Sequence, residues 1–286
     1  MKEKISNSFF NFKGILKKIE YPCVMGVLNL TNDSFYSGSR ISNEKELLCK
    51  AEQMLADGAS ILDIGAVSSR PGANLSNETN ELKKIIPAIK SLRKTFPDVI
   101  ISVDTYRAKV AKNAINEGAD IINDISGGSF EQNFFETIAE LKVPYVLMHI
   151  QGKPQNMQDN PIYDNIIHNI NFYFAQKIKK LNEHGVYDII IDPGFGFGKT
   201  LEHNYCLLNN LQLFHIHNCP ILIGISRKAM IYKVLNCNPE DALYGSLFAY
   251  SIALMKGVSI LRVHDVKATV NIIKICYYLA TKTQSH

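Results

Sequence analysis

Eight short runs rich in valine, isoleucine and leucine recur along the 286-residue chain. Continuous apolar runs, as opposed to alternating ones, are typical of strands that are buried on both faces, as in parallel sheets. Amphipathic stretches of helical period separate them. The runs cover residues 23–28, 60–64, 100–103, 120–122, 145–148, 189–191, 221–225 and 259–263. This pattern favours a fold built around a buried parallel sheet.

The segments between the runs carry helix start and stop signals. The stretch 43–55 follows Ser42, a predicted N-cap, and ends toward Gly58, and the stretch 107–116 ends in the same manner at Gly118. The repeating unit is therefore strand, loop, helix and glycine. Eight such units without a low-complexity linker predict an α/β fold, a (β/α)8 TIM barrel in a single domain. An open, doubly wound sheet is the alternative, because a strand count from one sequence is easily wrong by one.

Composition agrees with one large domain. Hydrophobic residues make up 46% of the chain and charged residues 20%, the balance of a globule with a large core. Barrels of this kind take up about 250 residues. We therefore expect a barrel domain at residues 21–280 that follows an N-terminal extension at residues 1–20.

Several protein classes are disfavoured. The six cysteines form no CxxC pair, so they indicate neither a zinc cluster nor a redox motif, and we expect most of them to be buried thiols. The net charge of +4 comes from dispersed basic residues, which does not favour a nucleic-acid partner. No run approaches the roughly 20 apolar residues of a membrane span, and the N-terminus lacks a signal-peptide pattern. We expect a cytoplasmic protein with no membrane partner.

Polar residues follow directly after the apolar runs. In a barrel the carboxyl ends of all strands converge on one mouth, where active sites of this fold lie. Each such residue could also be a cap or turn residue, which Asp, Asn and Ser favour. The residues at the eight exits are Asn29, Ser69 and Arg70, Asp104, Asn123, Met148 and His149, Asp192, Ser226 to Lys228, and His264 with Asp265.

Two carboxylates at these exits need hydrogen-bond donors. Asp104 and Asp192 would lie in a partly desolvated mouth, where a lone charge is costly. A ring rich in N–H groups, such as a pterin, could supply donors, and Asn123 could donate and accept at the same ring edge. Lys228 could neutralise one carboxylate. The alternative is that both aspartates are capping or salt-bridging residues.

Cationic and donor groups at the same mouth suit an anion. Arg70 and Arg262 offer guanidinium forks that match phosphate oxygens, and His264 and Asn29 add donors. A diphosphate leaving group would normally carry Mg²⁺, for which Asn29 is a candidate oxygen ligand. Surface ion pairing is the alternative for each arginine.

The glycine-rich segment 192–200 resembles a phosphate-binding P-loop but fails that motif, because Pro193 stands where a glycine is required. A close-approach loop with Phe195 or Phe197 as an aromatic wall is the better interpretation. A metal hydrolase site built from His149, His264 and the two aspartates is a further alternative, which no HxH pair supports.

Taken in order, several blocks of this chain resemble the dihydropteroate synthase family. They are MGVLNLTNDSF at 25–35, DIG at 63–65 with SSRPGA at 68–73, SVDT at 102–105, NDISGG at 123–128, LMH at 147–149, DPG at 192–194 with GKT at 198–200, SRK at 226–228 and RVHDV at 262–266. The resemblance runs from about Tyr21 to near the C-terminus. It implies a transferase of folate biosynthesis that joins a dihydropterin diphosphate to para-aminobenzoate, works with Mg²⁺, forms a homodimer and is a sulfonamide target.

The resemblance also implies roles for individual residues. The pterin pocket would comprise Asp104, Asn123, Met148, Asp192, Gly224, Lys228 and Arg262. Asn29, Arg70, Arg262 and His264 would hold the diphosphate, with Asn29 as the metal ligand, and Ser69, Pro71, Phe197, Ser226 and Lys228 would lie near para-aminobenzoate. Asp33, Arg70, Asp104 and Lys228 would be the catalytic residues.

The chain departs from the family pattern in two loops. Asn32, Ser37 and Ser39 replace a proline, an aspartate and a glycine in the first loop, and the second loop has Ala66 and Val67 where the family commonly has Gly-Glu. These changes bear on loop closure and sulfonamide sensitivity more than on the reaction. Two alternatives stay open: a pterin-binding module like those of corrinoid methyltransferases, and an inactive pterin-binding paralogue.

Overall fold

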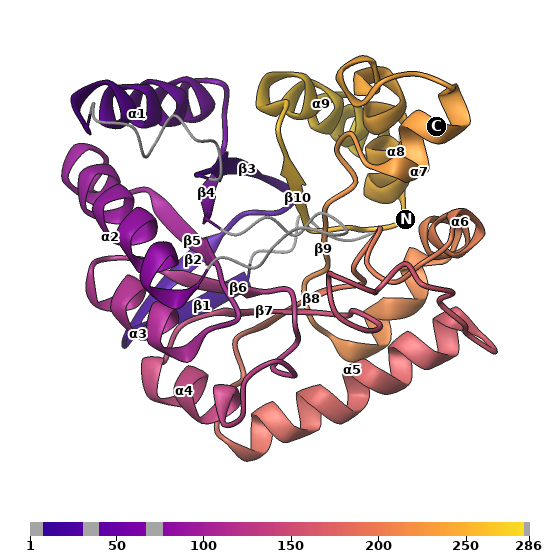
Figure 1. The fold of residues 1–286 in the computed structure, drawn as a ribbon. Helices are drawn as coiled ribbons and strands as arrows, with labels where there is room; N and C mark the ends of the chain where they lie inside the picture. The colour runs from indigo at the N-terminus through magenta and orange to yellow at the C-terminus, as the bar shows by residue number, and fades with distance from the viewer. Residues whose placement is uncertain (1–7, 31–39, 67–76, 283–286) are drawn as a thin grey trace.

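A computed structural model of the chain describes residues 8–30, 40–66 and 77–282. Eight parallel strands pair in the order β8-β7-β6-β5-β4-β3-β10-β9. A parallel bridge between Ile191 and Ile221 joins the two outer strands of this order, so the sheet closes on itself. Helices surround the strands on all sides (Figure 1). The predicted (β/α)8 barrel is confirmed, and the doubly wound sheet is excluded because such a sheet stays open.

The barrel strands are short and alternate with helices. The strands are β3 (Cys23–Asn29), β4 (Ile61–Gly65), β5 (Ile100–Asp104), β6 (Ile121–Asp124), β7 (Tyr145–Met148), β8 (Ile189–Asp192), β9 (Leu222–Ile223) and β10 (Ile260–Val263). The helices are α1 (Arg40–Ala56), α2 (Glu78–Thr95), α3 (Ala108–Asn116), α4 (Phe134–Leu141), α5 (Ile166–Glu183), α6 (Leu201–Asn209), α7 (Ala229–Leu235), α8 (Leu243–Met255) and α9 (Val266–Lys282). Among the described residues, the connections also contain the 3₁₀ helices Leu211–His217 and Pro239–Asp241.

Most predicted boundaries agree with the structure to within one or two residues, and two details differ. Helix α1 begins at Arg40, so Ser42 lies inside the helix and is not its N-cap. The run 221–225 forms only the two-residue strand β9, because the amides of Ile225 and Ser226 bond a tyrosine hydroxyl instead of a neighbouring strand. Gly58 and Gly118 follow their helices with φ of +101° and +110°, the left-handed backbone that ends many helices.

A hairpin closes the amino-terminal end of the barrel. Strands β1 (Ser8–Phe12) and β2 (Ile15–Ile19) pair antiparallel within the predicted extension. Their buried side chains Phe10, Phe12 and Ile19 share one apolar cluster with inward-facing residues of the barrel strands. Because this cluster fills the lower barrel, the carboxyl ends of the strands are left to form the mouth.

Strand alternation places the polar residues one layer above this apolar cluster. Side chains two positions apart on a strand point to the same face. The apolar layer contains Ile61, Ile121, Val146, Ile190, Leu222 and Ile260. Two residues further along the same strands come Asp63, Asn123, Met148, Asp192, Gly224 and Arg262. The layer of inward-facing side chains at the mouth is therefore mostly polar, although the strands that carry it are otherwise apolar.

A second and larger apolar cluster fills the space between the strands and the surrounding helices. Of the six cysteines only Cys23 is buried, while Cys49 and Cys206 are exposed and the other three are half-buried, so the expectation that most are buried is wrong. All six are free thiols. Among the helices that the structure describes, none has the length and apolar character needed to cross a membrane.

Candidate active site

The floor of the mouth is a network of two carboxylates around one guanidinium. Arg262 Nε donates to Asp63 Oδ2 at 2.6 Å, and Arg262 Nη2 donates to Asp104 Oδ2 at 2.9 Å. Asp63 is fully buried and also accepts from the Ser102 hydroxyl at 2.6 Å and from Asn123 Nδ2 at 3.2 Å. The side chains of strands β4, β5, β6 and β10 thus fix one another across the barrel.

Burial governs the charge of Asp104. It raises the pKa of this carboxyl to about 7, although Arg262 opposes the rise, and nearby Asp63 adds to it. Asp63 already occupies the Nε side of the guanidinium, so Asp104 shares its cation with another carboxylate. A ligand that donates N–H groups to Asp104 would favour the ionised form.

Asp192 and Lys228 form the opposite side of the mouth. Asp192 Oδ1 accepts from the Gly194 amide at 2.8 Å, and burial raises the pKa of this carboxyl while Lys228 lowers it. Lys228 Nζ donates to the Phe195 carbonyl at 2.6 Å and lies 4.6 Å from the centre of the Phe197 ring. Burial lowers the pKa of Lys228 to about 8, with Asp192 opposing. Lys228 is thus held by a carbonyl and an aromatic face, with the Asp192 carboxylate near enough to act on its charge.

The exits of β9 and β10 meet at Ser226 and His264. The Ser226 hydroxyl lies 3.2 Å from His264 Nδ1. Behind them, the Tyr250 hydroxyl of α8 accepts from the amides of Ile225 and Ser226, each at 2.9 Å, and donates to the Arg262 carbonyl at 2.7 Å. Arg227 forms a two-bond pair with Asp265, at 2.9 and 2.8 Å. One buried phenol and one ion pair therefore set the spacing of these two exits.

An apolar cluster lies above β5 to β7. Tyr106, Ile125 and Met148 are buried together there, and Phe130, Ile150 and Phe197 pack against them. The cluster is separate from both the lower barrel cluster and the helix-facing core. The Tyr106 hydroxyl is buried with no hydrogen-bond partner within the described part of the chain. A flat heterocycle could lie against this wall with its edge toward the carboxylates.

The structure therefore brings many of the predicted site residues to one mouth. Asn29 ends β3 on the same side, and Gly224 leaves space beside Arg262, whose Cβ would lie 3.8 Å from an added Cβ. Asp33, Ser69, Arg70 and Pro71 lie outside the described residues. So do the departures from the family pattern at Asn32, Ser37, Ser39 and Val67.

His149 engages a lysine and not a metal-binding set. Its Nδ1 lies 3.0 Å from Lys199 Nζ, and burial, followed by the Lys199 charge, holds the pKa of His149 well below its usual range. In the described ranges no three His, Cys, Asp or Glu side chains gather into a group that could hold a metal. The positions of these metal-ligating side chain types thus give the metal hydrolase alternative no support.

Sequence reasoning missed two contributors to this site. Asp63 received no role, although a carboxylate inside the buried run Ile61 to Gly65 is a signal, since a buried charge requires partners. Tyr250 lies in the middle of helix α8 and carries no local signal, because its partners come from β9 and β10. Only the tertiary contact identifies it.

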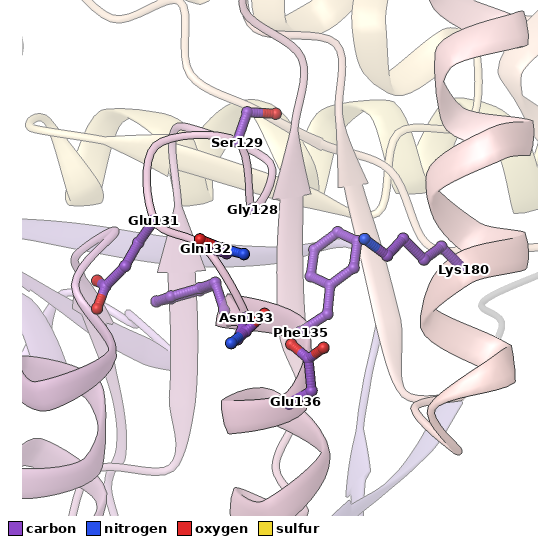
Figure 2. A pocket seen from close by; sticks show the side chains of 9 residues that line it. Gly128, Ser129, Glu131, Gln132, Asn133, Phe135, Glu136 and Lys180 are labelled. Carbon is purple, nitrogen blue, oxygen red and sulfur yellow. The ribbon is translucent and has the colours of Figure 1, made fainter.

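A separate cavity lies away from this mouth. It has a volume of about 350 Å³ and is lined by residues of the β6–α4 connection, α4 and α5. Figure 2 shows the Lys180 side chain extending to the Phe135 ring, with Glu131 on the far side of the loop. The Glu131 carboxylate accepts from the Ala108 amide at the start of α3. None of the predicted substrate residues that the structure describes lines this cavity, and we assign no site to it.

The arrangement at the mouth suits recognition and charge stabilisation. Buried carboxylates face donors, Lys228 and His264 face acceptors, and an apolar wall lies alongside. Ser226 and Lys199 each lie within hydrogen-bond reach of a histidine, but among the described residues no carboxylate hydrogen-bonds either imidazole, so neither pair has the third group of a nucleophilic triad.

Comparison with known proteins agrees with this geometry. Residues 25–264 match the family model described as pterin binding enzyme. The barrel and its mouth therefore define a pterin-binding enzyme.

The relatives are more specific. The dihydropteroate synthase of Escherichia coli K12 is 42% identical over 265 residues, which cover 92% of this chain and 93% of that protein. The Haemophilus influenzae enzyme of the same name is 40% identical and covers 90% of this chain and 94% of its own length. A Yersinia pestis dihydropteroate synthase structure with a sulfonamide drug complex is 39% identical with a TM-score of 0.89, covering 96% of this chain and 100% of its own. A Xanthomonas albilineans dihydropteroate synthase with 4-aminobenzoic acid is 32% identical with a TM-score of 0.88, covering 96% and 99%. The chain belongs to the dihydropteroate synthase family, and it is accordingly a transferase.

Proposed function

We propose that this enzyme condenses 7,8-dihydropterin-6-ylmethyl diphosphate with para-aminobenzoate to give 7,8-dihydropteroate and diphosphate. The observation that carries the proposal is the polar layer in which Asp63, Arg262, Asp104 and Asn123 are linked and faced by Asp192. A pterin ring presents several N–H groups along one edge, and such an edge matches buried acceptors.

Pterin recognition would combine this edge with a stacking wall. Asp104, Asn123 and Asp192 would accept or donate at the ring edge, while Met148 and Arg262 would lie against its faces. Lys228 would donate to a ring acceptor, because its ammonium lies near Asp192, which is itself a proposed pterin ligand. Binding at several fixed groups at once would orient the methylene carbon toward the open mouth.

Departure of diphosphate is the step that the cationic groups would assist. The C–O bond to the diphosphate breaks with its electron pair going to the leaving oxygen, and the pterin delocalises the resulting positive charge. His264 and Arg70 would stabilise the leaving anion. The arylamine nitrogen then attacks the methylene carbon and loses a proton. No covalent bond to the enzyme is required.

Mg²⁺ is the proposed cofactor, with Asn29 as its protein ligand. This ion usually keeps several waters and is held by few protein oxygens together with substrate phosphates. A single amide oxygen at the end of β3 fits that sparse contribution. When bound, the ion supplies neutralisation of the leaving diphosphate charge.

Para-aminobenzoate would bind beside the pterin, near Phe197, Ser226 and Lys228, with Ser69 and Pro71 of the second loop. The Phe197 ring and the Lys228 ammonium already contact each other. An aromatic ring and a carboxylate on the incoming substrate would match that pair. The same site makes the chain a candidate sulfonamide target.

The test is diphosphate release by the purified protein with dihydropterin diphosphate, para-aminobenzoate and Mg²⁺. We expect release that depends on the arylamine, is lost on chelation of Mg²⁺ and returns when Mg²⁺ is restored. Asp104→Ala and Lys228→Ala should each lower kcat/KM by about a hundredfold or more, because Asp104 is the proposed acceptor for the pterin N–H groups and Lys228 the proposed donor to both substrates. Pterin binding without arylamine-dependent release would instead identify the inactive paralogue.

We also infer a homodimer. Helices α8 and α9 expose large apolar side chains at helical spacing: Tyr244 (82% exposed) and Phe248 (70%) on α8, and Ile275 and Tyr278 on α9. The two helices lie next to each other on one side of the barrel (Figure 1). An exposed apolar patch of this kind is typical of an interface, and a second copy is the occupant that we propose.

We infer further that the enzyme works in the cytoplasm. The six cysteines are free, and two of them are exposed. Exposed thiols persist in the reducing cytosol and are readily oxidised elsewhere.

A further inference from the structure

Lys199 is a buried cation to which the proposed reaction gives no role. Its side chain is 3% exposed, and its ammonium lies 2.9 Å from the carbonyls of Gly194 and Phe197 and 3.0 Å from His149 Nδ1. Burial lowers the pKa of Lys199 to about 7, with Asp192 opposing. A buried ammonium is tolerated only where its donors are used. Three residues therefore supply acceptors to the Lys199 ammonium, so that its donors are used although it is buried.

The acceptors converge because of the backbone of the β8–α6 loop, residues 193–200. Gly194, Gly196 and Gly198 have φ of +72°, +80° and +60°, which lets the loop turn the carbonyls of Gly194 and Phe197 toward one ammonium. An added Cβ at Gly194 would lie 1.9 Å from the His149 carbonyl, and one at Gly198 would lie 2.4 Å from that of Gln151. The loop thus lies directly on the segment that follows β7, with the Lys199 ammonium between them.

The other side of the same loop carries Phe197 and contacts Asp192 and Lys228, three residues that are assigned to substrate. The Gly194 amide donates to Asp192, the Phe195 carbonyl accepts from Lys228, and the Phe197 ring lies under the Lys228 ammonium. A shift of the loop would therefore move a pterin acceptor, an aromatic wall and a cation together.

We propose that Lys199 is a positioning residue, which holds the β8–α6 loop against His149 so that Asp192, Phe197 and Lys228 keep the arrangement that binds pterin and arylamine. The inference rests on the proposed function for the identity of the two substrates. His149 is the neutral acceptor in this arrangement, with its Nδ1 turned to the ammonium. Lys199 itself contacts neither substrate.

The test compares Lys199→Met with Arg93→Met. Arg93, at the end of α2, also binds three backbone carbonyls, those of Pro97, Val99 and Gly118, but it does so far from the mouth. Three quantities are measured for each protein: the melting temperature, the Kd of 6-hydroxymethylpterin from its fluorescence, and KM for para-aminobenzoate. Both variants should melt at a lower temperature. When Kd and KM are measured well below the melting temperature of each variant, only Lys199→Met should raise the pterin Kd and the arylamine KM, each by about tenfold or more.

If Lys199→Met does not fold, a milder variant tests the same proposal. The Tyr163 hydroxyl donates to the Gly198 carbonyl at 2.8 Å, so Tyr163→Phe loosens the same loop and leaves Lys199 in place. It should raise both constants by about two- to fivefold. The proposal would be overturned if Lys199→Met kept both the pterin Kd and the arylamine KM within twofold of the wild type. If Lys199→Met does not fold, the same result in Tyr163→Phe would overturn it. Absence of turnover in the wild type would count against the proposed function alone, because the pterin Kd still reports on the loop.

Discussion

Asp104 shows how a single residue exchanges stability for binding. It stands beside Asp63 and shares the Arg262 guanidinium with it. Its folded pKa of about 7 lies above the value of about 3.9 in an unfolded chain, so its ionisation costs folding free energy. That cost is absent below about pH 4, grows as the pH rises, and is complete above about pH 7. The free enzyme is thus destabilised at the pH at which the ionised Asp104 can accept hydrogen bonds from the pterin.

We therefore predict that Asp104→Asn stabilises the free protein at pH 8, by on the order of 1 kcal/mol, while it abolishes pterin binding. The gain should shrink toward zero near pH 4, since both forms of the side chain are then neutral. Urea denaturation across this pH range, together with pterin titration, measures both effects. A stability difference that does not change with pH would contradict the assignment of the raised pKa to Asp104.

At the scale of an element, helix α8 connects the outside of the barrel to its mouth. Tyr244 and Phe248 face outward, while the buried Tyr250 reaches the backbone of both β9 and β10. Strand β9 has only two residues, so hydrogen bonds from the helix replace part of the missing strand pairing. The position of Ser226 then depends on a side chain of a helix.

Tyr250→Phe should lower the free energy of unfolding by about 1–3 kcal/mol, because the amides of Ile225 and Ser226 lose their buried acceptor. We also expect a higher KM for the arylamine, since Ser226 is no longer held. Tyr145→Phe is the matched control: it removes a phenol that donates to Asp124, whose carboxylate keeps the Ser126 and Gly128 amides as donors. Denaturation and steady-state kinetics of both proteins give the comparison, and equal KM values in the two would argue against the role given to Tyr250.

At the scale of the whole molecule, the hairpin closes one end of the barrel and the strand exits form the other. Stability and function are thus separated along the barrel axis, as in other barrels of this class. The exposed face of α8 and α9 adds a third region, which belongs to neither end.

Light scattering of the wild type should give the mass of two chains at micromolar concentration. Phe248→Asp should halve that mass, because a charge would replace an apolar side chain at the proposed interface. Lys83→Asp, a charge change at an exposed position of α2, serves as the control and should leave the mass unchanged. A monomeric wild type would refute the dimer.

The periodic pattern of this sequence determined the fold and much of the mouth. Buried strands need continuous apolar runs, and parallel strands expose the residues that follow them at one end, so the sequence alone places Asp104, Asn123 and Asp192 together. The ordered blocks identified the family for the same reason: binding residues lie next to strands whose spacing is fixed. Local sequence carried this information because each of these residues is positioned by its own strand.

Only the tertiary structure decided which side chains pair across the barrel. Asp63 and Arg262 are 199 positions apart, and their 2.6 Å contact exists because the last strand, β10, pairs with the first barrel strand, β3, which in turn pairs with β4. Lys199 and Tyr250 likewise gain their roles from partners on other elements. A residue's neighbours along the chain set which way it points, but the free energy of a buried charge or hydroxyl depends on the groups that it meets in space.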